Sequence, residues 1–123
     1  MSTRSRIGYM TEDGKYESIY CHNGGSEFYN GAVLLKNYLN IVRVKELISY
    51  GDASYIEPRL DQCCFYHRDR DEDWDSVKPK LLDLNEVYKV TEEYNYVFIN
   101  GEWFGFTYDI GDKYSIREFL ERN

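Results

Sequence analysis

The sequence has few of the patterns that mark membrane or exported proteins. No apolar run approaches the ~20 residues that a membrane-spanning helix needs. Residues 1–6 are polar, so the start of the chain does not resemble the apolar region of a signal peptide. We therefore expect a cytoplasmic protein with no membrane segment.

Basic charge is also scarce. The chain has 15 Lys and Arg residues against 22 Asp and Glu residues, which gives a formal net charge of −7. Proteins that bind nucleic-acid phosphates normally present a basic face, so direct nucleic-acid binding is disfavoured. An acidic protein can instead dock on a basic surface of another protein.

Cysteine and histidine are too few, and too irregularly spaced, to indicate a metal site. Neither of the zinc-site spacings CxxC and HxxxH is present, so we predict no metal and no cofactor. We interpret Cys21, Cys63 and Cys64 as reduced, metal-free thiols, because an odd count in a reducing compartment does not indicate a disulfide framework. Neighbouring strand residues point to opposite faces, so the pair Cys21 and His22 does not indicate a nucleophile, and we predict no catalytic residue.

Aromatic residues, by contrast, are abundant. They make up 17% of the chain and include 13 tyrosines, whose polar tips favour the edge of a core or a binding surface. The hydrophobic fraction of 42% is enough for one core, and 123 residues is the size of one domain. We therefore treat residues 1–123 as a single domain.

Two β-hairpins are predicted from their turns. Strand-forming residues flank a loop with Asp13-Gly14, which predicts a hairpin over residues 5–22. Aromatic runs flank Asn100-Gly101, which fits a type I′ turn and predicts a hairpin over residues 94–108.

The helical segments are predicted from periodicity and caps. Phe28, Ala32, Leu35 and Leu39 form an apolar stripe that predicts a helix over residues 27–39. Further helices are expected over residues 41–50, ended by Gly51, and over residues 112–123.

The rest of the chain completes a fold of the α+β class. Residues 62–67 suit a buried strand, residues 52–61 and 68–75 suit loops, and residues 76–93 have mixed periodicity. We expect an antiparallel sheet of two hairpins plus one strand, with two helices packed on it and a C-terminal helix.

Five side chains are predicted to form a cationic patch that binds a ligand or partner: Arg4, His22, His67, Arg68 and Arg70. Arg4 precedes the first strand and His22 ends the second, so an antiparallel hairpin places them side by side. If the strand over residues 62–67 runs parallel to residues 16–21, His67 and Arg68 reach the same edge. On a continued strand, Arg68 and Arg70 share one side. The alternative is that each arginine pairs with a nearby aspartate.

Several motifs together resemble a family of small phage and prophage proteins. They are Met-Ser-Thr-Arg-Ser-Arg-Ile-Gly at 1–8, Ser-Ile-Tyr-Cys-His at 18–22, Lys-Glu-Leu-Ile-Ser-Tyr-Gly-Asp at 45–52, Tyr-His-Arg-Asp-Arg at 66–70 and the aromatic hairpin at 94–103. The similarity covers most of residues 1–105. Asn23-Gly24-Gly25 departs from the acidic residue and Gly-Tyr usual in the family, and Asp71 replaces a usual glycine. The resemblance implies a phage setting and no particular chemistry.

These observations favour a non-enzymatic phage accessory protein that acts in the host-cell cytoplasm. It would modulate a host system, such as a defence system, in the manner of an anti-CRISPR inhibitor. Its partner would be a host protein or a small anionic signal that it sequesters. The alternative is a small enzyme that acts on a phosphate-bearing substrate with His22, His67 and the arginines. If residues 20–22, which include His22, and residues 66–70, which include His67, face one pocket, ligand binding or catalysis is favoured.

Overall fold

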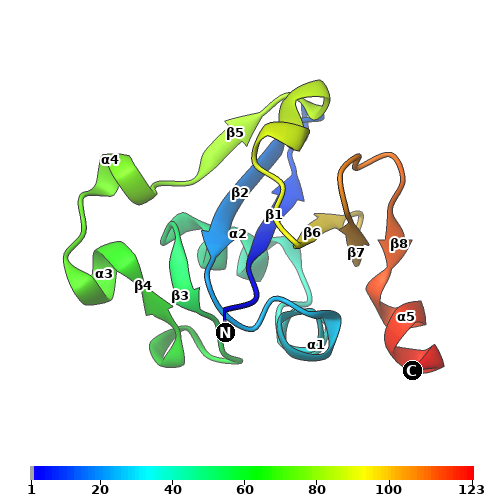
Figure 1. Ribbon diagram of the computed structural model, residues 1–123, viewed down its shortest axis with the longest axis horizontal. Helices are drawn as coiled ribbons and strands as arrows, with labels where there is room; N and C mark the ends of the chain where they lie inside the picture. The colour runs from blue at the N-terminus through cyan, green and yellow to red at the C-terminus, as the bar shows by residue number, and fades with distance from the viewer. Residues whose placement is uncertain (1) are drawn as a thin grey trace.

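A mixed β-sheet organises the chain in the computed structural model, which describes residues 2–123; Met1 of the opening motif lies outside the described residues. Eight strands of this part of the chain form one sheet in the order β4-β3-β2-β1-β6-β7-β8, with β5 also beside β2 (Figure 1). The strands are β1 Ser5–Met10, β2 Tyr16–Cys21, β3 Ala53–Tyr55, β4 Cys64–Phe65, β5 Lys80–Leu82, β6 Tyr94–Ile99, β7 Glu102–Phe106 and β8 Tyr114–Ser115.

Both predicted hairpins are confirmed. Strands β1 and β2 pair antiparallel, from Ser5 opposite Cys21 to Met10 opposite Tyr16. Strands β6 and β7 pair antiparallel across a two-residue turn. In that turn Asn100 has φ 49° and Gly101 has φ 83°, and these two positive φ values are the ones that a type I′ turn requires.

The expectation of a wholly antiparallel sheet was wrong. Strand β1 pairs with β6 in parallel, and β2 pairs with β3 in parallel. A turn signal in the sequence predicts the pairing of only the two strands that flank the turn. The parallel pairs join strands that no single turn connects. The short strands β3 and β5 lie in segments that the sequence predicts as a loop or that have mixed periodicity.

The first helical segment begins differently from the prediction. It starts with a wide π-helical turn, η1 Glu27–Gly31, and continues as α1 Ala32–Asn37. The wider turn changes the phase of the segment, so Leu34 and Tyr38 are buried, whereas Phe28 and Leu39 of the predicted stripe are exposed.

The other two predicted helices are confirmed in outline. Helix α2 Ile41–Ser49 begins where the Asn40 side chain accepts a hydrogen bond from the Arg43 backbone, and Gly51 follows it with φ 82°. Helix α5 Ile116–Arg122 is capped by Ser115, whose hydroxyl accepts from the Glu118 backbone at 3.2 Å.

The prediction for residues 62–75 was only partly right, because a strand with buried Phe65 lies there but covers two residues, and most of the expected loop is helical. The strand β4 ends at Phe65, and the chain turns at once into α3 Tyr66–Arg70 and then α4 Trp74–Val77. The Asp69 carboxylate accepts a hydrogen bond from the Phe65 backbone at 2.8 Å, and Asp71 ends the helix in the left-handed conformation with φ 58°. Local side-chain bonding of this kind favours a helical turn over an extended strand.

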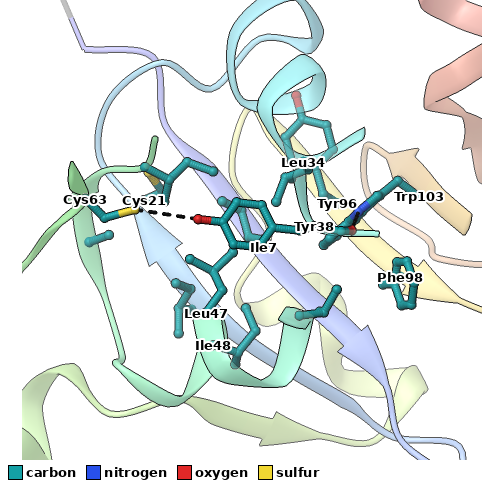
Figure 2. Packing of buried hydrophobic residues seen from close by; sticks show 14 of the residues in the cluster. Ile7, Cys21, Leu34, Tyr38, Leu47, Ile48, Cys63, Tyr96, Phe98 and Trp103 are labelled. Carbon is teal, nitrogen blue, oxygen red and sulfur yellow. Dashed lines mark hydrogen bonds between the residues drawn. The ribbon is translucent and has the colours of Figure 1, made fainter. Parts of the chain in front are cut away.

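The main core lies between the sheet and the helices. Tyr38 crosses this core with its hydroxyl toward Cys63, and its backbone carbonyl accepts from the Trp103 indole at 2.8 Å (Figure 2). The opposite face carries a smaller core of Tyr16, Val87, Val97, Phe106 and Ile110. The short helices η2 Leu60–Gln62 and η3 Leu84–Lys89 complete the elements, with η3 contributing Val87 to the smaller core. None of the helices described between residues 2 and 123 has both the length and the apolar character of a membrane span.

Candidate functional site

A polar surface lies where β2 ends, on the sheet face opposite the main core. We call it the arginine surface, and it comprises Arg4, Arg6, Tyr20, His22, Ser54, Tyr66 and Arg70. The register of the first hairpin places Arg6 opposite Tyr20, so both side chains project from this face. Arg4 comes directly before the pair formed by Ser5 and Cys21, and His22 comes directly after it, so both lie at the same end of this hairpin.

The His22 ring is held at both of its nitrogens. Its Nδ1 atom lies 2.6 Å from the Tyr20 hydroxyl, and its Nε2 atom lies 2.9 Å from the Ser2 hydroxyl. Burial raises the pKa of Tyr20, and the nearby Arg4 guanidinium opposes that rise. The ring is therefore positioned by two hydroxyl groups, and the Arg4 charge acts on one of them, the Tyr20 hydroxyl.

Arg6 is buried in this surface, and no carboxylate of the described residues pairs with it. Its side chain is only 4% exposed, and it donates to the Ser18 hydroxyl at 2.9 Å and to the Ser18 carbonyl at 3.2 Å. Burial lowers the pKa of Arg6, although the charges of Tyr16, Asp52 and Glu92 oppose this. An arginine still keeps its charge, so Arg6 places a fixed cation below the surface.

Asp52 balances part of this charge. Its Oδ1 atom accepts a hydrogen bond from the Tyr20 backbone at 2.9 Å. Burial raises the pKa of Asp52, and Arg6 and Lys80 oppose the rise. No carboxylate of residues 2–123 comes within 4.0 Å of the Arg6 guanidinium, so Asp52 interacts with it only at longer range.

Arg70 joins the surface from α3. It lies over the Tyr66 ring, 5.3 Å from the ring centre, and reaches the Ser54 hydroxyl at 3.4 Å. Tyr66 and Arg70 stand four residues apart and therefore share one side of the helical turn. Within the described chain, neither Arg4 nor Arg70 forms an ion pair, so the alternative of local aspartate pairing does not apply to them.

His67 and Arg68 are held by other contacts. His67 Nδ1 lies 2.8 Å from the Glu72 carbonyl, and its ring stands edge-on to Trp74. Arg68 pairs with Asp69 at 2.9 Å, as the aspartate alternative expects. The assumption that Arg68 and Arg70 share one side was wrong, because residues two apart on a helix point in nearly opposite directions.

A pocket of about 380 Å³ opens beside the arginine surface, between the η1–α1 segment and the chain after β3. We call it the aromatic pocket. Its lining includes the exposed rings of Phe28, Tyr29 and Tyr55, the amides of Asn23 and Asn30, and the charged Lys36 and Glu57. The sequence did not indicate this pocket. The apolar stripe predicts Phe28 on the packed side of a helix, and Tyr55 falls within a predicted loop.

Asn23 connects the pocket to the arginine surface. Its side-chain amide donates to the Ser54 carbonyl at 2.9 Å and to the Ser54 hydroxyl at 3.3 Å. The same hydroxyl is the contact of Arg70. Ser54 therefore contacts both Asn23, which lines the pocket, and Arg70 of the arginine surface.

Cys21 and Cys63 lie in the main core, on the other side of the sheet from this surface. Cys21 and Cys63 are buried free thiols, and Cys64 is partly exposed. Burial raises the pKa of Cys21 to about 11 and also raises the pKa of Cys63. Over residues 2–123 no three donors from His, Cys, Asp and Glu are gathered in a way that could hold a metal ion.

No protein-family model, curated protein or solved structure matches this chain.

Proposed function

We propose that this chain is a non-enzymatic binding protein for a small anionic ligand, with Arg4, His22 and Arg70 at the binding surface. The observation that carries the proposal is the unpaired state of the arginines at the end of β2. Six basic residues form an ion pair within the described chain: Lys15, Arg43, Arg59, Arg68, Lys78 and Lys89. Five arginines form none there, namely Arg4, Arg6, Arg70, Arg117 and Arg122, and the first three of these lie around Tyr20 and Tyr66 at the end of β2.

The chemistry of these groups suits an anion with several oxygens. A guanidinium donates two parallel hydrogen bonds to a carboxylate or phosphate, and such charge-assisted bonds are about twice as strong as neutral ones. Buried Arg6 adds a fixed positive charge behind the exposed Arg4 and Arg70. Because the molecule as a whole is acidic, a free anion is attracted only close to this surface, so we expect binding that weakens with salt.

The arrangement favours binding over catalysis. Both His22 nitrogens already bond to hydroxyl groups, and His67 bonds to the Glu72 carbonyl. The two histidines are thus not arranged as the acid–base pair that the enzymatic alternative requires. In the phage setting that the resemblance implies, the protein would act in the host cytoplasm by sequestering a small anionic signal of a host defence system.

The test compares two arginines by isothermal titration calorimetry with inorganic phosphate. Arg70→Ala should weaken phosphate binding about tenfold, which corresponds to the loss of a charge-assisted contact. Arg59→Ala is the matched control, because Arg59 is exposed and pairs with Asp61 away from the surface. Equal phosphate affinity of the two variants would contradict the proposal, as would turnover of a phosphate ester by the purified protein.

A further inference from the structure

Asn30 presents an unsatisfied acceptor to the aromatic pocket. Its side chain is 3% exposed, and its Nδ2 atom donates to the Ser5 hydroxyl and to the Asn23 carbonyl, both at 3.1 Å. The Asn23 carbonyl can only accept, so these bonds fix the orientation of the Asn30 amide. The other end of the amide, Oδ1, accepts no hydrogen bond from residues 2–123.

This oxygen faces the pocket. Within the described chain, no fully buried side-chain nitrogen or oxygen lacks a partner, so Oδ1 must be open to solvent even though Asn30 is nearly enclosed. Asn30 and Gly24 both line the pocket, and a Cβ placed on Gly24 would lie 3.1 Å from Oδ1. Gly24 has φ 71°, which favours glycine at this position and leaves the space beside the oxygen free.

The remaining lining suits a flat aromatic ring. Phe28, Tyr29 and Tyr55 are all exposed beside the pocket, and rings of this kind stack on nucleobases in a sequence-tolerant way. The volume of about 380 Å³ falls in the range of small-ligand pockets, about 300–1,000 Å³. The pocket thus offers an acceptor and aromatic rings, and Ser54 connects its residue Asn23 to the Arg70 guanidinium.

We infer that the aromatic pocket holds a nucleobase that carries an amino group, as adenine and cytosine do, and that the anionic ligand is a nucleotide. The amino group donates to Asn30 Oδ1, the base stacks against Tyr55, and the phosphate extends past Asn23 to Arg70. This inference rests on the proposed function, because it identifies the class of anion that the arginine surface binds.

The test uses four ligands: AMP, adenosine, purine riboside 5′-monophosphate and inorganic phosphate. The third compound differs from AMP only by lacking the amino group, so it tests Asn30 Oδ1 without altering the protein. Calorimetry of the wild type should give the highest affinity for AMP. Purine riboside 5′-monophosphate should bind about fivefold more weakly, as expected for one lost hydrogen bond.

A protein variant tests the aromatic wall. Tyr55→Ala should weaken AMP binding by about fivefold or more, which is the lower range for base stacking, and should leave phosphate binding unchanged. Tyr108→Ala is the matched control. Tyr108 is also an exposed tyrosine, but its ring lies tilted against Tyr88 and does not line the pocket, so this variant should bind AMP as the wild type does.

The outcomes separate this inference from the proposed function. Phosphate binding that depends on Arg70, with no preference for AMP over purine riboside 5′-monophosphate, would overturn the nucleobase assignment alone. Adenosine binding that depends on Tyr55, with no contribution from phosphate or Arg70, would support the pocket and overturn the anion-binding function. No binding of any of the four compounds would overturn both.

Discussion

Replacing Arg68 with alanine tests the division between structural and ligand-binding arginines. The Arg68 guanidinium donates to the carbonyl oxygens of Leu60 and Cys63 at 3.0 and 2.9 Å, and it pairs with Asp69. It also lies over the buried ring of Phe65, 4.9 Å from the ring centre. These contacts tie η2, β4 and α3 together, so their loss should destabilise the fold.

The magnitude follows from these contacts. A hydrogen bond from a charged group contributes about 1.5–3 kcal/mol, and a solvent-exposed ion pair contributes about 0–1 kcal/mol. The Arg68 side chain is 30% exposed, so in the alanine variant water can hydrogen-bond to some of the groups that Arg68 contacts. We expect Arg68→Ala to lower the free energy of unfolding by about 2 kcal/mol. For a domain of this size, that corresponds to a fall in Tm of roughly 8 °C.

Differential scanning calorimetry measures this change, with Arg70→Ala as the control from the same helix. Arg70 forms no ion pair in the described chain, so its loss should change stability by less than about 0.5 kcal/mol. Arg68→Lys should fall between the wild type and Arg68→Ala, because lysine keeps the charge but lacks the planar fork. An Arg68→Ala protein with a wild-type Tm and no phosphate binding would refute the reasoning and place Arg68 at the site.

Three further predictions concern the turn, a buried carboxyl group and the thiols. Gly101→Val should lower the midpoint of urea unfolding by an amount equivalent to about 1–2 kcal/mol, because a β-branched residue resists φ 83°; an unchanged midpoint would contradict the turn assignment. Burial raises the pKa of Asp52 above its ordinary value, so its ionisation opposes folding, and the contribution of Asp52 to stability should become more favourable as pH falls through the raised pKa. Asp52→Asn should therefore be at least as stable as the wild type at pH 7, with the difference shrinking toward pH 4 in urea titrations; a constant difference would count against a raised pKa. A thiol reagent at pH 8 should modify Cys64 alone in the native protein, because Cys21 and Cys63 are buried; rapid modification of all three thiols would contradict their burial.

The sequence predicted the elements that depend on local signals. Asn100-Gly101 and Gly51 each act within a few residues, through a turn or a helix end, and the structure contains the corresponding hairpin and helix end. The apolar pattern over residues 62–67 predicts a longer strand than β4, which covers only Cys64–Phe65. There the Asp69 carboxylate bonds to the Phe65 backbone and starts a helical turn, which an apolar pattern alone does not reveal.

The position of Arg70 and the aromatic pocket depend on contacts between segments that are distant in the sequence, whereas the position of Arg4 and His22 does not. The proximity of Arg4 and His22 followed from the hairpin, because the register of two adjacent strands fixes which residues face each other. The place of Arg70 depended on α3 and on Ser54, and neither the helix nor the strand that carries Ser54 was predicted. The aromatic pocket depended on the π-helical turn, which exposes Phe28 and buries Asn30.

The parallel pairing of β1 with β6 also has a consequence for synthesis on the ribosome. Residues from Ser5 to Tyr9 find their partners, Tyr94 to Phe98, only after roughly 90 further residues have been added. At about 5–20 residues per second, the nascent chain carries β1 with one unpaired edge for roughly 5–20 s. An open strand edge is a template for pairing with other chains. Translation that stalls before β6 should therefore yield fragments that aggregate, although the N-terminal hairpin itself is already complete.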